Sequence, residues 1–461
     1  MARRVIVIGL DSAPPELVFG ELAPHMPNLG HLIARGLHGT LRSCDPPITI
    51  PAWQVMATSA SPGRLGLYGF RHRKGHAYTD GWVASSRSVH LPAVWDLAGA
   101  AGRQSCLIGV PPGYPPKPLS GWSISCFLTP PGAEQYTHPP KLRQEIEDLV
   151  GTYVFDVPFR VEDRETLRAN LFEMTRKRFD VAVHLAATKP WDLFWLVEIG
   201  VDRLGHAFWK FFDPAHPKYE PGNPFEHIAV EYYSLIDERI GELMALLPDA
   251  VFLVVSDHGS RAMAGAFCVN EWLVERGWLV LEQQPDDIVS IDEADVDWAR
   301  TRAWGWGGYY ARIFLNVEGR EPNGVIPAGA YEQARAELEA ELQTIPLSDG
   351  RPMPVTAMRP EDLYPVAEGD RPDLMVYFDD LRWRSAGTIG HGTLYLSEND
   401  TGPDDSVHSM DGIVVLSDPD RTFGTPVGDA TILDVAPTIL TLMGLPVQAD
   451  MEGRALPEIA D

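Results

Sequence analysis

Short, uninterrupted hydrophobic runs recur along the chain, and three of them are followed directly by polar side chains. These runs cover residues 5–10, 193–197 and 251–255. They lack the alternation of a half-exposed strand, so they predict parallel strands buried on both faces. Ligands of parallel sheets gather at the carboxyl ends of the strands. The polar residues just after these runs are therefore the first place to look for function.

Helical periodicity fills much of the sequence between the runs. We expect helices over 28–36, 142–150, 165–187 and 229–247, the last one amphipathic with Asp237 and Glu238 facing solvent. Strands that alternate with helices predict an α/β fold, in which a mostly parallel central sheet is covered by helices on both faces.

Two regions interrupt this alternation. Residues 111–140 are rich in Pro, Gly and Ser, which predicts a long ordered loop or lid. We expect the whole lid or loop region to cover residues 111–165. Residues 281–372 carry a small α/β pattern of their own, with a strand over 311–317 and a helix over 328–344. We therefore expect a core formed by 1–280 and 373–461, with 281–372 inserted as a subdomain.

Composition narrows the classes of partner. The 461 residues include 64 acidic and 38 basic side chains, and the net charge of −26 repels duplex nucleic acid and anionic lipid. No hydrophobic stretch approaches the ~18 residues of a membrane span. Four scattered cysteines fit a reducing compartment. We expect a cytoplasmic protein that binds neither duplex nucleic acid nor a membrane; its oligomeric state is not predicted.

Two pairs of residues have the character of metal ligands. Asp257 and His258 follow the 251–255 strand and precede a glycine, and Asp202 and His206 stand four apart after the 193–197 strand. Carboxylate and imidazole together suit Zn²⁺ or a similar ion, and an i,i+4 spacing places both side chains on one helical face. The alternatives are a helix-capping Asp beside an exposed His, and an ordinary ion pair on a helix surface.

Three further residues are weaker signals when taken singly. Asp11 follows the first strand, and His408 precedes a strand around 413–416. Thr49 lies two residues before Pro51, which suits the first turn of a helix. A helix N-terminus favours an alkoxide and the phosphate it attacks. Taken singly, an Asp or His in such a place is more often a cap or a satisfied polar residue, and the alternative for Thr49 is a plain N-cap.

Taken in order, these motifs resemble one known family. The chain presents Gly-Leu-Asp11, then Pro-x-Thr49-x-Pro-Ala-Trp, Asp202-x-x-x-His206, Ser-Asp257-His258-Gly, and His408 before a final strand. This order resembles the type I phosphodiesterase/nucleotide pyrophosphatase branch of the alkaline phosphatase superfamily, above all its prokaryotic members described as predicted phosphohydrolases or phosphomutases. The resemblance implies an alkaline-phosphatase-like three-layer α/β/α sandwich.

The same resemblance implies a catalytic site with two divalent metal ions, Zn²⁺ first and Mn²⁺ as the alternative. One ion would be held by Asp202, His206 and His408, and the other by Asp11, Thr49, Asp257 and His258. Thr49 would be the nucleophile and would form a phospho- or nucleotidyl-threonine intermediate. Related sulfatases use a modified Cys or Ser and an Arg two residues after the motif's Pro, where this chain has Trp53, so sulfatase chemistry is not expected.

The expected activity is hydrolysis of a phosphodiester or nucleotide pyrophosphate bond in a small-molecule phosphate ester or nucleotide. The same residues would serve a phosphomonoesterase or a phosphomutase, and a non-catalytic metal-binding interaction protein is the alternative of another class.

His391 is a second candidate for the last ligand, and the order of motifs favours His408. Candidate substrate contacts are Asn270, Trp304, Trp306, Tyr309, Arg312, Tyr68 and Arg71; for the aromatic residues, a glycine turn feeding a strand with core rings is the alternative.

Overall fold

The computed structural model describes residues 3–347 and 349–460. The chain divides into two compact units, and each is described by itself. The first unit comprises residues 1–65, 84–260 and 409–461, and the second comprises 66–83 and 261–408. The predicted insertion, 281–372, lies inside the second unit, and its independence as a subdomain stays a prediction.

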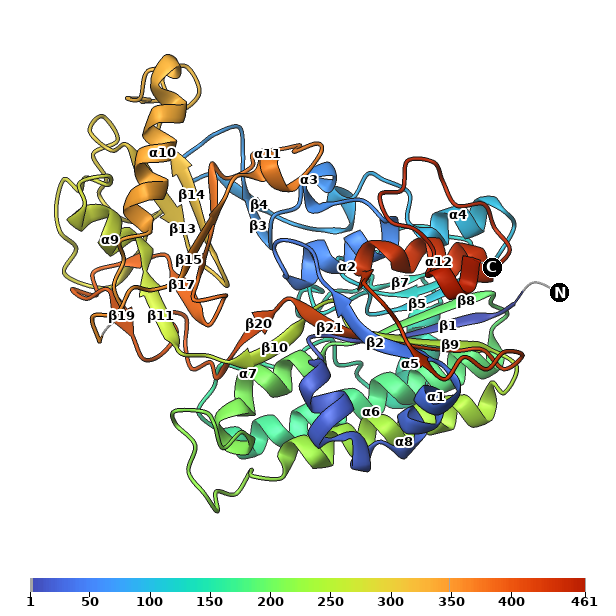
Figure 1. The fold of residues 1–461 in the computed structure, drawn as a ribbon. Helices are drawn as coiled ribbons and strands as arrows, with labels where there is room; N and C mark the ends of the chain where they lie inside the picture. Colours follow the sequence, from blue (N-terminus) through green and yellow to red (C-terminus); the bar gives the residue numbers. More distant parts are fainter. Residues whose placement is uncertain (1–2, 348, 461) are drawn as a thin grey trace. The chain divides into compact units, whose positions relative to one another are not determined.

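The first unit is built on a large sheet with a parallel centre (Figure 1). Its parallel strands, in spatial order, are β9 (Val251–Val255), β1 (Val5–Leu10), β8 (Leu193–Glu198), β5 (Ser105–Ile108) and β6 (Gly121–Ile124). Beyond β9 comes β21 (Asp411–Ser417), which is antiparallel to β9, and then β2 (Leu37–Arg42), which is antiparallel to β21. Every residue of β1, β8 and β9 is buried. The three strands predicted from hydrophobic runs are thus confirmed, together with the mostly parallel sheet.

Helices cover both faces of this sheet and complete the predicted three-layer α/β/α arrangement. One layer contains α2 (Thr49–Thr58), α4 (Val94–Ala100) and α12 (Val435–Leu442), which share a hydrophobic core with alternate residues of β1 and β9. The opposite layer contains α1 (Pro27–Arg35), α6 (Arg164–Thr188) and α8 (Ile228–Leu246), which lie together in Figure 1. With α5 (Leu142–Val150), the predicted helices of this unit are confirmed within about two residues at each end.

One detail of the predicted α8 is wrong. Asp237 was expected to face solvent, but it is 2% exposed, whereas its neighbour Glu238 is exposed. The Asp237 carboxylate accepts hydrogen bonds from the backbone N–H groups of Asn28 (3.0 Å) and Leu29 (2.8 Å) and from the Asn28 side chain (2.9 Å). The first turn of α1 leaves its N–H groups without helical partners. Asp237 supplies the missing acceptors from another helix, which a periodicity argument does not reveal.

The Pro-rich segment also differs from expectation. Most of 111–140 lacks regular structure, but β6 lies within it and extends the parallel sheet beside β5, and the two-residue strand β7 (Thr137–His138) pairs with β6. Three of the four β6 residues are only partly buried. A partly exposed strand of this kind, next to the edge strand β7, lacks the continuous hydrophobic run that marks a central one. The function of 111–165 as a lid stays a prediction.

The second unit has a mixed sheet and a separate core. Its strands run in the order β13 (Ala303–Trp306), β14 (Ala311–Leu315), β16 (Leu374–Phe378), β17 (Trp383–Ala386), β11 (Gly265–Cys268) and β19 (Tyr395–Leu396), and β15 (Val355–Met358) also pairs with β16. The helices α9 (Val269–Glu275) and α10 (Tyr331–Leu342) accompany them. The strand expected over 311–317 and the helix expected over 328–344 correspond to β14 and α10.

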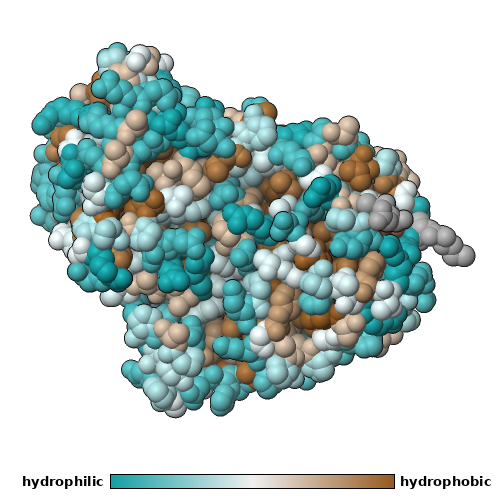
Figure 2. Space-filling model, viewed as in Figure 1, coloured by the Kyte–Doolittle hydropathy of each residue, from teal (hydrophilic) through white to brown (hydrophobic). Residues whose placement is uncertain are grey.

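The surface agrees with the polar composition. The face drawn in Figure 2 is largely hydrophilic, with hydrophobic patches dispersed over it. Among the helices of the described residues, none combines the length and hydrophobicity needed to cross a membrane.

The contact between α1 and α8 gives a test of the fold. Asp237→Ala removes three accepted hydrogen bonds from a buried helix start and should lower the free energy of unfolding by about 2 kcal/mol. Glu238→Ala, one residue along on the exposed side of α8, is the matched control and should stay within about 0.5 kcal/mol of wild type. Urea unfolding followed by circular dichroism measures both, and equal stability of the two variants would contradict the capping role of Asp237.

Candidate metal centre

The first group of candidate ligands lies at the ends of two neighbouring strands. Asp11 follows β1, while Asp257 and His258 follow β9, and these strands are adjacent and parallel. Their carboxyl ends therefore meet at one edge of the sheet. One ligand atom from each of the three residues lies within 4.8 Å of the others, and all three side chains are fully buried. Strand register alone thus assembles two carboxylates and an imidazole.

Neighbouring groups hold these carboxylates in fixed orientations. The indole Nε1 of Trp53, on α2, donates a 2.7 Å hydrogen bond to Asp11 Oδ2, and the Ser12 backbone N–H donates to Asp257 Oδ1 at 3.2 Å. Gly9 makes room for the indole, because a Cβ at this position would lie 2.3 Å from the Trp53 ring. Each carboxylate keeps its other oxygen turned toward the group of ligands.

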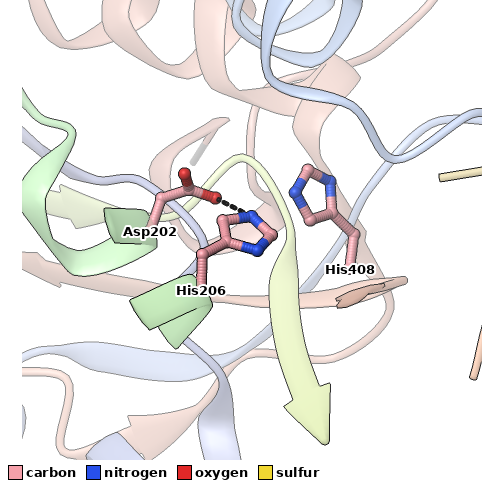
Figure 3. A group of neighbouring side chains, drawn as sticks. All are labelled: Asp202, His206 and His408. Atoms are coloured by element: carbon pink, nitrogen blue, oxygen red, sulfur yellow. Dashed lines mark ion pairs between the residues drawn. The ribbon is translucent and has the colours of Figure 1, made fainter. Parts of the chain in front are cut away.

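The second group comes from one helix and one strand. Asp202 and His206 lie one turn apart on α7 (Gly200–Phe212), where Asp202 Oδ1 is 3.2 Å from His206 Nε2. His408 lies on β20 (Ser406–Ser409), immediately before the segment that returns to the first unit. Ligand atoms of the three residues lie within 4.8 Å of one another, and Figure 3 shows the His408 ring beside the Asp202–His206 pair.

A buried network positions α7. Glu198, the last residue of β8, accepts hydrogen bonds from the Gly200 backbone N–H (2.7 Å) and the Arg178 guanidinium (2.8 Å). Arg203 donates to Asp202 Oδ2 at 2.6 Å and also pairs with Asp156. The sequence predictions did not include Trp53, Arg203 or Arg178 as supporting residues. Trp53 and Arg203 lie inside the quoted motifs, whereas no local signal marks Arg178, which lies 20 residues before its partner.

The candidate nucleophile lies beside the first group. Thr49 is the first residue of α2, as the position of Pro51 predicted, and it is 2% exposed. Its Oγ1 is 3.4 Å from Nε2 of His258. The first-turn N–H groups of a helix have no carbonyl partners within the helix and attract anions. Thr49 thus combines a hydroxyl, the nearby imidazole of a candidate ligand and a favourable place for an anion.

The electrostatics of the first group fit a cation. Burial, followed by the charge of Asp202, raises the pKa of Asp11 well above its ordinary value, and burial and the Asp11 charge do the same for Asp257. Among the described residues, none donates a hydrogen bond to Asp11 Oδ1 or Asp257 Oδ2. Buried carboxylates of this kind are stabilised by pairing or by coordination to a metal. The donor set of carboxylates and imidazoles suits a divalent ion such as Zn²⁺.

Two of the candidate substrate contacts, Trp304 and Asn270, make packing and hydrogen-bond contacts inside the second unit instead. Trp304 is fully buried and packs edge-on against Tyr78 and Trp298. The Asn270 amide donates to the carbonyls of Gly305 and Gly387 and accepts from the Gly305 N–H, all at 2.8 Å. These contacts favour the alternative interpretation, a glycine turn with core aromatic residues, for this part of the motif.

The remaining candidates fall into two sets. Tyr68 is buried and donates its hydroxyl to the Glu368 carbonyl at 2.7 Å. Trp306 is 5% exposed, and the guanidiniums of Arg71 and Arg312 lie over its ring. Tyr309, by contrast, stacks on the ring of His408, with centroids 3.6 Å apart and planes at 24°. Tyr309 is therefore the candidate that the structure brings into contact with a candidate metal ligand.

His391 is engaged elsewhere. Its Nε2 lies 2.7 Å from the Thr388 hydroxyl, and its backbone N–H donates to Glu271. Among the described residues, the groups that could hold an ion include His408 and not His391.

Comparisons with known proteins agree with this geometry. The family model of type I phosphodiesterase / nucleotide pyrophosphatase matches residues 5–404. The solved structure of human ectonucleotide pyrophosphatase / phosphodiesterase 5 is 13% identical, with 97% of this chain and 96% of that chain covered and a TM-score of 0.58. Phosphonoacetate hydrolase from Sinorhizobium meliloti 1021, in complex with phosphonoformate, is 16% identical, with 96% of each chain covered and a TM-score of 0.63. A comparison with curated proteins found no match.

The hydrogen bond from Trp53 to Asp11 gives a test of the first ligand group. Trp53→Phe keeps an aromatic ring but removes the N–H that orients the carboxylate, and it should weaken metal binding by about 10–100-fold. Trp195→Phe is the matched control: Trp195 is equally buried and packs against Trp53, yet its indole nitrogen has no hydrogen-bond partner among the described residues. Competition with a chromogenic chelator measures both affinities. Equal losses in the two variants would mean that packing, rather than the hydrogen bond, supports the site.

Proposed function

The chain belongs to the type I phosphodiesterase/nucleotide pyrophosphatase family and is thus a hydrolase of phosphoric esters. We propose that it cleaves a phosphodiester or nucleotide pyrophosphate bond and that Thr49 is the nucleophile. The observation that carries the proposal is the position of the Thr49 hydroxyl. It lies at the start of α2, 3.4 Å from Nε2 of His258, which is grouped with the buried carboxylates of Asp11 and Asp257.

The two groups of residues are proposed to hold one divalent ion each. Asp11, Asp257 and His258, with Thr49, would bind the first ion, and Asp202, His206 and His408 the second; Zn²⁺ suits both sets, with Mn²⁺ as the alternative. Such ions, when bound, lower the pKa of hydroxyl and water ligands and stabilise charge on the attacking and leaving oxygens of an in-line transfer.

The side chains of the protein then perform the positioning. Thr49 attacks phosphorus with its Oγ1 as the P–O bond to the leaving group breaks, and the leaving oxygen takes up the proton that the hydroxyl loses. Water then attacks phosphorus of the phospho- or nucleotidyl-threonine, the Oγ1–P bond breaks, and the Thr49 hydroxyl is regenerated. The N–H groups at the start of α2 face the phosphoryl oxygens of a group bound at Thr49. Trp53 and Arg203 fix the Asp11 and Asp202 carboxylates, so the site needs little rearrangement during the reaction.

Two of the similar structures support the chemistry by analogy. One is the murine ectonucleotide pyrophosphatase / phosphodiesterase 5 in an inactive form with a threonine replaced by alanine, in complex with AMP; it is 13% identical, with a TM-score of 0.56. The other is phosphonoacetate hydrolase in complex with phosphonoacetate, 14% identical with a TM-score of 0.64. Both complexes contain small ligands with phosphoryl or phosphonyl groups. We propose a small phosphate ester as substrate here, acting in a reducing compartment such as the cytoplasm, where the four free cysteines would be stable.

Removal of the nucleophile tests the covalent route. Thr49→Ala should lower kcat at least about a thousandfold, because no other hydroxyl replaces the attacking oxygen. Thr58→Ala is the control on the same helix: its buried hydroxyl donates only to the Gln54 carbonyl, so the variant should retain most of the activity. Release of nitrophenol from bis(4-nitrophenyl) phosphate by the Zn²⁺-loaded protein measures both. Retained activity in Thr49→Ala would rule out the threonine intermediate.

The type of ester is tested by a ratio of rates. We expect kcat/KM for bis(4-nitrophenyl) phosphate to exceed that for 4-nitrophenyl phosphate, and EDTA to abolish both activities. A monoester rate that exceeds the diester rate, with the same dependence on Thr49, would identify a phosphomonoesterase or phosphomutase instead.

A further inference from the structure

Residues 151–163 connect α5 to α6 without forming a helix or a strand, and we call this segment the strap. The strap, α6 and α7 all belong to the first unit. Three cationic side chains of α6 donate hydrogen bonds to strap carbonyls: Lys177 to Thr152 (3.0 Å), Arg178 to Phe155 (3.0 Å), and Arg164 to Phe159 (3.1 Å) and Val161 (2.6 Å). Backbone carbonyls outside regular structure need such donors. The strap therefore has a defined conformation, which fixes the side chains that it presents to α7.

Asp156, in the middle of the strap, forms a two-point ion pair with Arg203 of α7. The Nε and Nη2 groups of Arg203 donate to the two carboxylate oxygens of Asp156 at 2.7 and 2.9 Å. The remaining nitrogen, Nη1, donates to Asp202 Oδ2 at 2.6 Å. Bidentate pairs of this kind are strong and fix the plane of the guanidinium. A single guanidinium thus joins the strap to a candidate metal ligand.

Aromatic rings shield this guanidinium from water. Its carbon lies 4.5 Å from the centroid of the Phe159 ring and 5.2 Å from that of Phe127, and only 8% of the Arg203 side chain is exposed. The Phe159 ring also lies 5.3 Å from the ring of His206. Charges interact more strongly where water is excluded. The positive charge of Arg203 therefore acts on Asp202 with little screening.

A cation so close to Asp202 has two opposite effects on a metal site. It orients the carboxylate through Oδ2, but its charge opposes the binding of a divalent ion. Asp202 Oδ1 faces the other candidate ligand of α7 and lies 3.2 Å from His206 Nε2. A guanidinium can bind both oxygens of one carboxylate. Without Asp156, the nitrogens of Arg203 that now face the strap would be available to Asp202, in competition with an ion.

We propose that Asp156 is a positioning residue for the ion bound by the α7 ligands. It engages two nitrogens of Arg203, leaves a single N–H group for Asp202, and offsets the positive charge beside the ion. The inference rests on the proposed two-ion site and deepens it, because a residue of the strap then controls the affinity for one of the two ions.

The Zn²⁺ affinities of the full-length protein test this role without any need for turnover. Competition with a chromogenic chelator measures them, and His206→Ala identifies which affinity belongs to the α7 site. Asp156→Asn should weaken that affinity about tenfold or more, as expected for a residue that orients a metal ligand, and leave the other affinity unchanged. Glu162→Gln is the matched control: it neutralises an exposed carboxylate of the same strap and should stay within about twofold of wild type.

A double variant separates charge compensation from a merely structural role. Asp156→Asn combined with Arg203→Met removes the uncompensated charge, so this protein should bind the α7 ion several-fold more tightly than Asp156→Asn alone. A structural role predicts weaker binding, because the losses of two supporting residues would accumulate. Asp156→Glu keeps the negative charge and should lie between wild type and Asp156→Asn. Circular dichroism of the metal-free proteins checks folding, and Asp156→Ser replaces Asp156→Asn if the latter does not fold.

The outcomes separate this inference from the proposed function. An unchanged α7 affinity in Asp156→Asn, or a double variant that binds more weakly than Asp156→Asn, would overturn the role of Asp156 alone. Zn²⁺ binding that His206→Ala does not alter would overturn it together with the two-ion site. The expected affinities in a protein that does not hydrolyse bis(4-nitrophenyl) phosphate would support the role of Asp156 and contradict only the proposed reaction.

Discussion

The arrangement of the site depends on one electrostatic constraint, the burial of two carboxylates at the ends of adjacent parallel strands. Asp11 and Asp257 are fully buried side by side, and each raises the cost of ionising the other. A hydrophobic protein interior accommodates such a pair either by keeping it protonated or by pairing it with a cation. Strand register brings the carboxylates together, and a divalent ion bound there would bring chemistry to Thr49.

The surrounding residues are best understood as means to keep this pair in place. Trp53 occupies the space above Gly9 and donates to Asp11, and its helix begins at Thr49, so one short segment supplies both the orienting group and the nucleophile. On the other side, Glu198 fixes the start of α7 and Arg203 fixes Asp202. The rigid sheet therefore determines the geometry of the site, and the reactive residues need not lie on mobile loops.

The sequence predicted the parts of the fold that local patterns encode. Continuous hydrophobic runs identified β1, β8 and β9, because central parallel strands are buried on both faces. The partly exposed strand β6, in contrast, lacks that pattern. Asp237 was misplaced because its partners, Asn28 and Leu29, lie about 200 residues away in the sequence.

Of the site, ordered motifs singled out seven candidate residues; the structure places six of them in two groups that could hold an ion and Thr49 beside the first group, while their roles stay a prediction. Supporting contacts such as that between Arg178 and Glu198 were not predictable, since only tertiary structure brings the partners together. The role of the aromatic and glycine-rich run from Trp304 to Arg312 was ambiguous for the same reason. In the structure Trp304 is buried in the core, Tyr309 stacks on His408, and the Arg312 guanidinium lies over the Trp306 ring.

The central claim is that two divalent ions occupy the two ligand groups. An anomalous-difference map from a crystal of the Zn²⁺-loaded protein, recorded on both sides of the zinc absorption edge, measures this directly. The account predicts two strong peaks, one among Asp11, Asp257 and His258 and one among Asp202, His206 and His408. A map with no peak at either group, or with zinc bound only elsewhere, would contradict it.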